Sequence, residues 1–107
     1  MVLDDLRSKL VEYSKAGDVL RLGVLRYFLS QVQNKEIELR PQKIELTEKH
    51  VYKVLKKQIK QRKESIELYE KGGRKDLVDK ESAELKVLEE FAQLFPQHEE
   101  ESNVQGQ

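Results

Sequence analysis

Residues 60–80 read K-Q-R-K-E-S-I-E-L-Y-E-K-G-G-R-K-D-L-V-D-K, and this stretch decides the fold of the chain. The glycine pair near its centre interrupts a helical pattern that extends upstream to about residue 48 and downstream to about Phe95. Two long helices joined by so short a turn are expected to pack as an antiparallel hairpin. Gly73 supplies the turn, because glycine accepts a positive φ freely.

The sequence before this hairpin predicts two further helices. Apolar residues at helical spacing place the first over about 2–15, and Gly17 ends it. Asp18 can cap a second helix, which continues until Pro41 stops it. We therefore expect an all-α fold, a small four-helix domain over residues 1–96 that ends in a long antiparallel helical hairpin.

Both ends of the hairpin carry recognisable signals. Thr47 is a good N-cap for the third helix, and Pro96 stops the fourth. After this proline the chain is acidic and polar, and Val104 is its one aliphatic residue. We expect residues 97–107 to form a disordered acidic tail.

Composition excludes several classes of protein. The 107 residues include no cysteine, which excludes disulfide frameworks, thiolate zinc sites and cysteine nucleophiles. No apolar run is long enough to span a membrane, and the first residues lack the pattern of a signal peptide. We expect a soluble protein of the cytoplasm, or of the mitochondrial matrix if the source is eukaryotic, with no membrane partner.

The formal net charge of zero hides an uneven distribution of charge. Residues 41–75 hold eleven positive and five negative side chains, a net charge of +6. Residues 76–107 hold two positive and nine negative side chains, a net charge of −7. Such asymmetry marks either an interaction face or two neighbouring helices that attract each other.

The lysines of the third helix form one stripe on its wheel, opposite the apolar side chains of Val51, Leu55 and Ile59. They are Lys49, Lys53, Lys56, Lys57, Lys60 and Lys63. One interpretation is an ordinary solvated helix face, and the other is a surface that contacts nucleic-acid phosphates irrespective of sequence. No aromatic residue lies within the stripe, which disfavours stacking on single-stranded bases.

Arg62 falls inside the apolar arc of the third helix, and Glu81 and Glu84 fall inside that of the fourth. In the antiparallel hairpin Arg62 lies across from about residue 84, so we predict a semi-buried ion pair with Glu84 or Glu81. The pair either fixes the register of the two helices or opens as a polar site to a ligand.

The sequence carries no catalytic constellation. Its two histidines, His50 and His98, are far apart, and we expect His50 to be a surface residue. There is no H-E-x-x-H, no glycine-rich phosphate loop and no Glu-x-x-His repeat of the kind found in di-iron bundles. We expect no catalytic residues, no metal and no cofactor.

Several segments resemble the GatB/YqeY-like family, and together they cover roughly residues 3–97. They are D-V-L-R-L-G-V-L-R (18–26), Q-N-K-E-I (33–37), L-T-E-K-H-V (46–51), the stretch quoted above (60–80) and A-E-L-K-V-L-E-E-F (83–91). The most specific part is the motif Q-R-x-x-S-I-x-x-Y-x-x-x-G-R-x-D-L. Its positions here include Arg62, Ser65, Tyr69, Gly73, Arg74, Asp76 and Leu77, most of which we interpret as hairpin architecture.

The resemblance implies a function. Family proteins typically continue into a second helical domain related to the tail of the GatB subunit of the tRNA-dependent amidotransferase, which engages tRNA. The family is therefore associated with carbon–nitrogen ligase activity that uses glutamine as amido-N-donor. The 107 residues end before such a domain, and the sequence leaves open whether its absence is natural or a truncation; for these residues we expect an accessory module that is not catalytic alone and that binds tRNA or an amidotransferase subunit. The alternative is a protein–protein interaction module with no nucleic-acid or catalytic role, and the sequence leaves the oligomeric state open.

Overall fold

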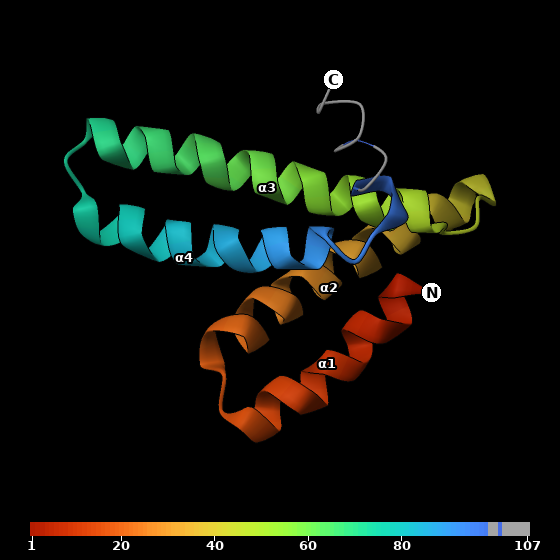
Figure 1. The fold of residues 1–107 in the computed structure, drawn as a ribbon. Coiled ribbons are helices and arrows are strands. Elements are labelled where there is room, and N and C mark those ends of the chain that lie inside the picture. Colours follow the sequence, from red (N-terminus) through yellow and green to blue (C-terminus); the bar gives the residue numbers. More distant parts are fainter. Residues whose placement is uncertain (99–100, 102–107) are drawn as a thin grey trace.

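The computed structural model describes residues 1–98 and 101, and in this part of the chain the fold is all-α, as predicted. Four long helices follow one another with short connections, and a 3-10 turn extends the second (Figure 1). They are α1 (Val2–Ala16), α2 (Val19–Leu39), η1 (Arg40–Gln42), α3 (Glu48–Lys71) and α4 (Lys75–Ala92). The predicted bounds of α3 agree with the structure, and those of α1 and α2 agree to within a residue.

The chain is arranged as two hairpins, with α1 and α2 in one and α3 and α4 in the other (Figure 1). Helix α2 is central, because it packs against α1, α3 and α4. Its apolar residues lie on all sides rather than in one stripe, as suits a helix with neighbours on several faces. The Arg21 guanidinium also binds the Glu90 carboxylate at 2.7 and 2.9 Å, which ties α2 to α4.

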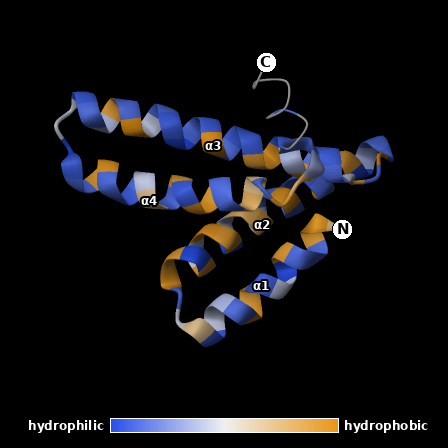
Figure 2. Cartoon of the chain, viewed as in Figure 1, coloured by the Kyte–Doolittle hydropathy of each residue, from blue (hydrophilic) through white to orange (hydrophobic). Residues whose placement is uncertain are grey.

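The hydrophobic core lies where α2 crosses the base of the α3–α4 hairpin (Figure 2). Its largest fully buried side chains include Phe28, Leu55, Leu88 and Phe91. No side chain of residues 59–86 is fully buried. The far half of the α3–α4 hairpin is therefore a two-helix extension that projects from the core.

Local signals fix the turns as predicted. Gly17 and Gly73 both have φ of 68°, the left-handed conformation that glycine adopts without strain. The Asp18 carboxylate accepts a hydrogen bond from the Arg21 backbone N–H at the start of α2. Thr47 caps α3, and its backbone N–H in turn donates to Nδ1 of His50 at 2.9 Å. His50, expected only as a surface residue, is thus half-buried and completes a capping box.

The end of α4 differs from the prediction. The helix ends at Ala92 rather than Phe95, and the chain turns so that Phe95 is buried with its ring 5.2 Å from that of Tyr52 on α3. The chain is helical again at residues 96–98 and 101. Of the tail that we expected to be disordered, Gln97, His98 and Glu101 are helical, and the rest lies outside the described residues.

Candidate nucleic-acid interface

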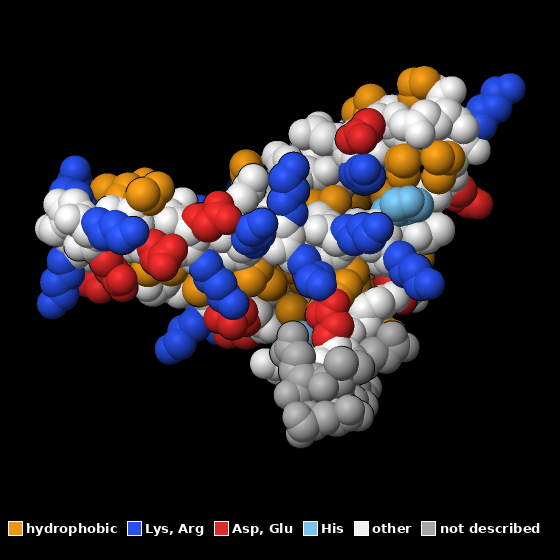
Figure 3. All heavy atoms as spheres, turned by 90° about the horizontal axis from the view of Figure 1, so that it is seen from above, with side chains coloured by type: hydrophobic (Ala, Val, Ile, Leu, Met, Phe, Trp, Pro, Cys, Tyr) orange, Lys and Arg blue, Asp and Glu red, His pale blue; other side chains and the backbone are white. Residues whose placement is uncertain are grey.

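The six lysines predicted as a stripe are all exposed on α3 (Figure 3). From Lys49 to Lys63 they extend over about 21 Å of helix, at about 1.5 Å per residue. Acidic side chains appear on the same face toward the Gly72 end of α3, where Glu64, Glu67 and Glu70 follow the last lysine of the stripe. The basic surface therefore belongs to the first two-thirds of α3.

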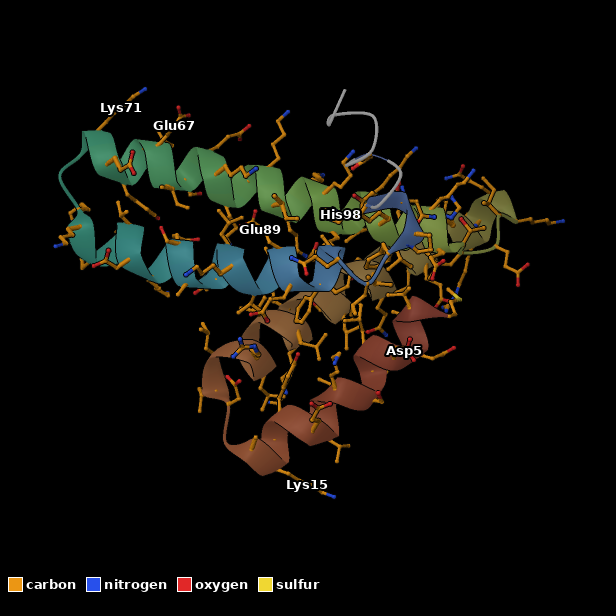
Figure 4. The ribbon with its side chains drawn as sticks, in the orientation of Figure 1. Asp5, Lys15, Glu67, Lys71, Glu89 and His98 are labelled. Carbon is orange, nitrogen blue, oxygen red and sulfur yellow. The ribbon has the colours of Figure 1, made fainter. Side chains whose placement is uncertain are left out.

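The structure divides five of these six lysines between two hollows, and Lys49 lines neither. Lys56, Lys60 and Lys63 line a hollow of about 760 Å³ beside α4 and the C-terminal segment. Carboxylates line the same hollow and balance the lysines; they are Glu64, Glu67, Glu89 and Glu101. Figure 4 labels Glu67 on α3, Glu89 on α4 and His98 on the C-terminal segment. This mixed lining makes the interior of the hollow a poor pocket for a small anion, while the three lysines stay exposed to a partner along the face of α3.

Glu101 forms an ion pair with Lys56. Its carboxylate lies 2.6 Å from the Lys56 ammonium and accepts a hydrogen bond of 2.7 Å from the Tyr52 hydroxyl. The bond from Lys56, followed by that from Tyr52, lowers the pKa of Glu101. Burial raises the pKa of Tyr52, and its bond to the carboxylate raises it further. Glu101 is therefore ionised at neutral pH and holds the described part of the C-terminal segment against α3.

The second hollow, of about 500 Å³, lies between α2 and α3 and has a different lining. Lys53 and Lys57 reach it from α3 and Lys35 from α2, while no carboxylate is among its lining residues. Its polar lining residues also include Gln31, His50, Gln58 and Gln61, and its one aromatic residue is Tyr27. Lys35 is paired with the Glu38 carboxylate at 3.4 Å, so the ammonium groups of Lys53 and Lys57 are the main attraction for a phosphate. We call this hollow the α2–α3 groove.

The α2–α3 groove brings in residues that sequence reasoning missed. Tyr27 and Lys35 belong to α2, far from the lysine stripe along the chain. Tyr27 places an aromatic ring, about half of whose surface is exposed, next to a lysine stripe that contains none of its own. No local sequence pattern predicts that Tyr27 lies beside these lysines, because its position depends on how α2 crosses α3.

Arg62 lies on the other side of α3 and forms the predicted ion pair, with both candidate partners. Its guanidinium contacts Glu81 at 2.7 Å and Glu84 at 2.9 Å. The exposed fractions of the three side chains are only 22%, 13% and 15%. These three side chains and Ser65 line a third hollow, of about 650 Å³. Because both carboxylates already engage the guanidinium, the cluster favours a structural role over ligand binding.

The remaining motif residues lie at the tip of the hairpin. The backbone N–H of Arg74 donates to the Tyr69 carbonyl at 2.9 Å across the turn at Gly73. The side chain of Arg74 pairs with Asp76 at 3.2 Å, and this hydrogen bond lowers the pKa of Asp76. Asp76 lies in the first turn of α4, where a negative charge is favourable. These four residues build the turn and are not part of the basic surface.

Metal sites and membrane spans are both absent from the described residues. These residues contain no group of three or more His, Cys, Asp or Glu side chains placed to hold a metal ion. Within residues 1–98, none of the helices combines the length and the hydropathy needed to cross a membrane.

The fold and the hairpin motif define a class of small helical domain, and comparison with known proteins identifies it. A family model described as "Yqey-like protein" matches residues 3–106, so the chain belongs to the YqeY-like family. This confirms the resemblance seen in the sequence. The chain is also 38% identical, over 91 residues, to a Kluyveromyces lactis protein named "Altered inheritance of mitochondria protein 41, mitochondrial". That alignment covers 85% of this chain and 48% of the relative, so the chain spans about half the length of the curated relative that it matches.

Proposed function

We propose that this YqeY-like domain is a non-catalytic accessory module of tRNA-dependent amidation that contacts tRNA through the lysines of α3. Family membership supports the coarse role of a module related to the GatB subunit of the amidotransferase. The observation that carries the tRNA contact is the exposed lysine surface of α3 together with the α2–α3 groove, whose lining holds lysines and no carboxylate. The name of the Kluyveromyces lactis relative, which includes the word mitochondrial, supports a mitochondrial location for this domain.

Salt dependence tests this proposal, because contacts to phosphates release counterions. Unfractionated tRNA is titrated with the chain at several salt concentrations, and binding is followed by fluorescence anisotropy. If three to four lysines contact phosphates, the affinity should fall by roughly 30- to 100-fold between 50 and 200 mM salt. The quadruple change K53Q/K56Q/K60Q/K63Q should abolish binding at the higher salt.

A matched variant controls for the loss of positive charge alone. K15Q/K75Q/K80Q/K86Q removes the same number of exposed lysines, from α1 and α4. It should keep most of the affinity if the α3 surface is the contact. Equal affinity of the wild type and the α3 variant would remove the lysine stripe from the proposal, and equal losses in the two variants would show a diffuse attraction without a defined surface.

One observation favours the second candidate, a protein–protein interaction module. Two adjacent apolar side chains at the start of α2 are exposed: Val19 by 80% and Leu20 by 42%. Clustered exposed apolar side chains are typical of protein contacts. A pull-down with an amidotransferase subunit as bait, with and without ribonuclease, separates the two. Capture that survives ribonuclease and high salt but fails for Val19→Ser with Leu20→Ser supports the interaction module.

A further inference from the structure

Gln58 is the one polar residue of the described core that is fully buried. Only 6% of its surface is exposed. Neither its amide nitrogen nor its amide oxygen has a hydrogen-bond partner among the described residues. A buried amide without partners has lost its hydrogen bonds to water and gained nothing in return. Such a group points either to a defect of the core or to a ligand that supplies the missing bonds.

The position of Gln58 favours a ligand. It lies on α3 between Val54 and Arg62, one turn from each, and with Tyr27 it lines both the α2–α3 groove and the neighbouring hollow of Arg62. Gln61 lines both hollows as well, so these three side chains lie where the two hollows meet. Tyr27 and Gln61, which also line both hollows, are exposed and lie outside the hydrophobic core, so their side chains can move without disturbing its packing.

Together the lining residues describe a composite ligand. The ammonium groups of Lys53 and Lys57, with Lys35 and its partner Glu38 across the groove, suit a phosphate, and the Tyr27 ring suits a flat aromatic surface. The Gln58 amide offers one donor and one acceptor side by side, the pattern that pairs with the edge of a nucleobase. Phosphate, flat ring and paired donor and acceptor occur together in a nucleotide whose base is unpaired.

We propose that the α2–α3 groove binds one unpaired nucleotide of RNA, with its base stacked on Tyr27 and read by Gln58 and its phosphates held by the lysines. This inference rests on the proposed function, because it names the part of the RNA that the lysine surface takes up. The lysine stripe alone contains no aromatic residue and so disfavours stacking on single-stranded bases. Tyr27 of α2 supplies the ring that the stripe lacks. A double helix does not fit the groove in this way, because its base edges are already paired.

The test compares RNA probes of equal length. The probes are 12-nucleotide oligoadenylate, oligocytidylate and oligouridylate, and a 12-base-pair RNA duplex, all measured by anisotropy at 100 mM salt. At least one single strand should bind more tightly than the duplex, although the duplex carries more charge. Gln58→Met keeps the length of the side chain and removes its hydrogen bonds; it should weaken that binding roughly tenfold. Tyr27→Ala should weaken it by a similar factor through lost stacking.

Stability provides a second readout that separates a ligand-binding amide from a structural one. Because the amide has no partner in the free protein, Gln58→Met should leave the melting temperature unchanged or raise it, while it weakens binding. Gln33→Met is the matched control, since Gln33 is an exposed glutamine on α2 that does not line the groove. It should change neither the binding of the single strands nor that of the duplex.

The outcomes distinguish this inference from the proposed function. If tRNA binds through the α3 lysines but the duplex binds as tightly as every single strand, or Gln58→Met binds like the wild type, the nucleotide site is wrong and the lysine surface stands. If Gln58→Met lowers the melting temperature and leaves binding intact, the amide is structural. If no RNA binds at all, both proposals fail.

Discussion

At the scale of a single residue, Arg62 stabilises the far half of the α3–α4 hairpin, which lies outside the hydrophobic core, through ion pairs. No side chain between residues 59 and 86 is fully buried, and Arg62 joins the two helices there through Glu81 and Glu84. Arg62→Ala should lower the free energy of unfolding by about 2–4 kcal/mol, because it leaves two half-buried carboxylates near each other without a counter-charge. Urea denaturation followed by circular dichroism measures the change.

Two further variants separate the ion pair from loss of side-chain mass. Lys63→Ala, on the exposed face of the same helix, should change the stability by less than about 0.5 kcal/mol. The triple variant R62M/E81Q/E84Q, which removes all three charges together, should recover much of the loss. A change below about 0.5 kcal/mol for Arg62→Ala itself would contradict the view that the cluster fixes the register of the hairpin.

At the scale of elements, α3 depends on the cap at its first turn. His50 N–H donates to the Thr47 hydroxyl, and the imidazole Nδ1 accepts a bond from the Thr47 N–H in return. Thr47→Val keeps the shape of the side chain and removes its oxygen, so we expect a loss of about 1 kcal/mol in unfolding free energy. The same denaturation experiment measures it, and Thr47→Ser, which keeps the hydroxyl, should lose much less. Equal losses in both variants would show that the hydroxyl contributes nothing.

Elements whose signals are local could be predicted from the sequence. Gly17, Gly73, Asp18 and Thr47 act within a few residues of themselves, and the helices begin and end where they indicate. The end of α4 could not be predicted in this way, because α4 stops where burying Phe95 against Tyr52 is better than another helical turn. Tyr27 and Lys35 could not be predicted as part of the candidate site because they also depend on tertiary packing. Both come close to α3 only because α2 crosses it.

The spacing of residues along α3 and α4 nevertheless predicted part of the candidate site. The exposure of the lysines and the pairing of Arg62 follow from helical periodicity and from the position of the turn, and both are confirmed. Periodicity could not show how the lysines divide. Lys56 and Lys57 are adjacent in the sequence, yet one faces Glu101 and the other lines a groove without carboxylates.

At the scale of the whole molecule, the zero net charge is a cancellation with a structural consequence. Glu101, which belongs to the acidic segment of the sequence, pairs with Lys56 of the basic helix. The lowered pKa of Glu101 means that this contact is fully present above the ordinary pKa of 4.5 and is lost only as the pH falls through the lowered value. At neutral pH the carboxylate therefore competes with any RNA phosphate for Lys56.

Glu101→Gln should consequently strengthen tRNA binding by roughly two- to fivefold at 50 mM salt, the size expected when one exposed ion pair is removed. The gain should shrink as salt screens the competing charge. Anisotropy titrations of the wild type and the variant at 50 and 300 mM salt measure both effects. Glu12→Gln, which removes one exposed carboxylate from α1, controls for net charge and should gain less. If the two variants gain equally, Glu101 acts only through the total charge of the molecule, and its contact with Lys56 has no part in excluding RNA.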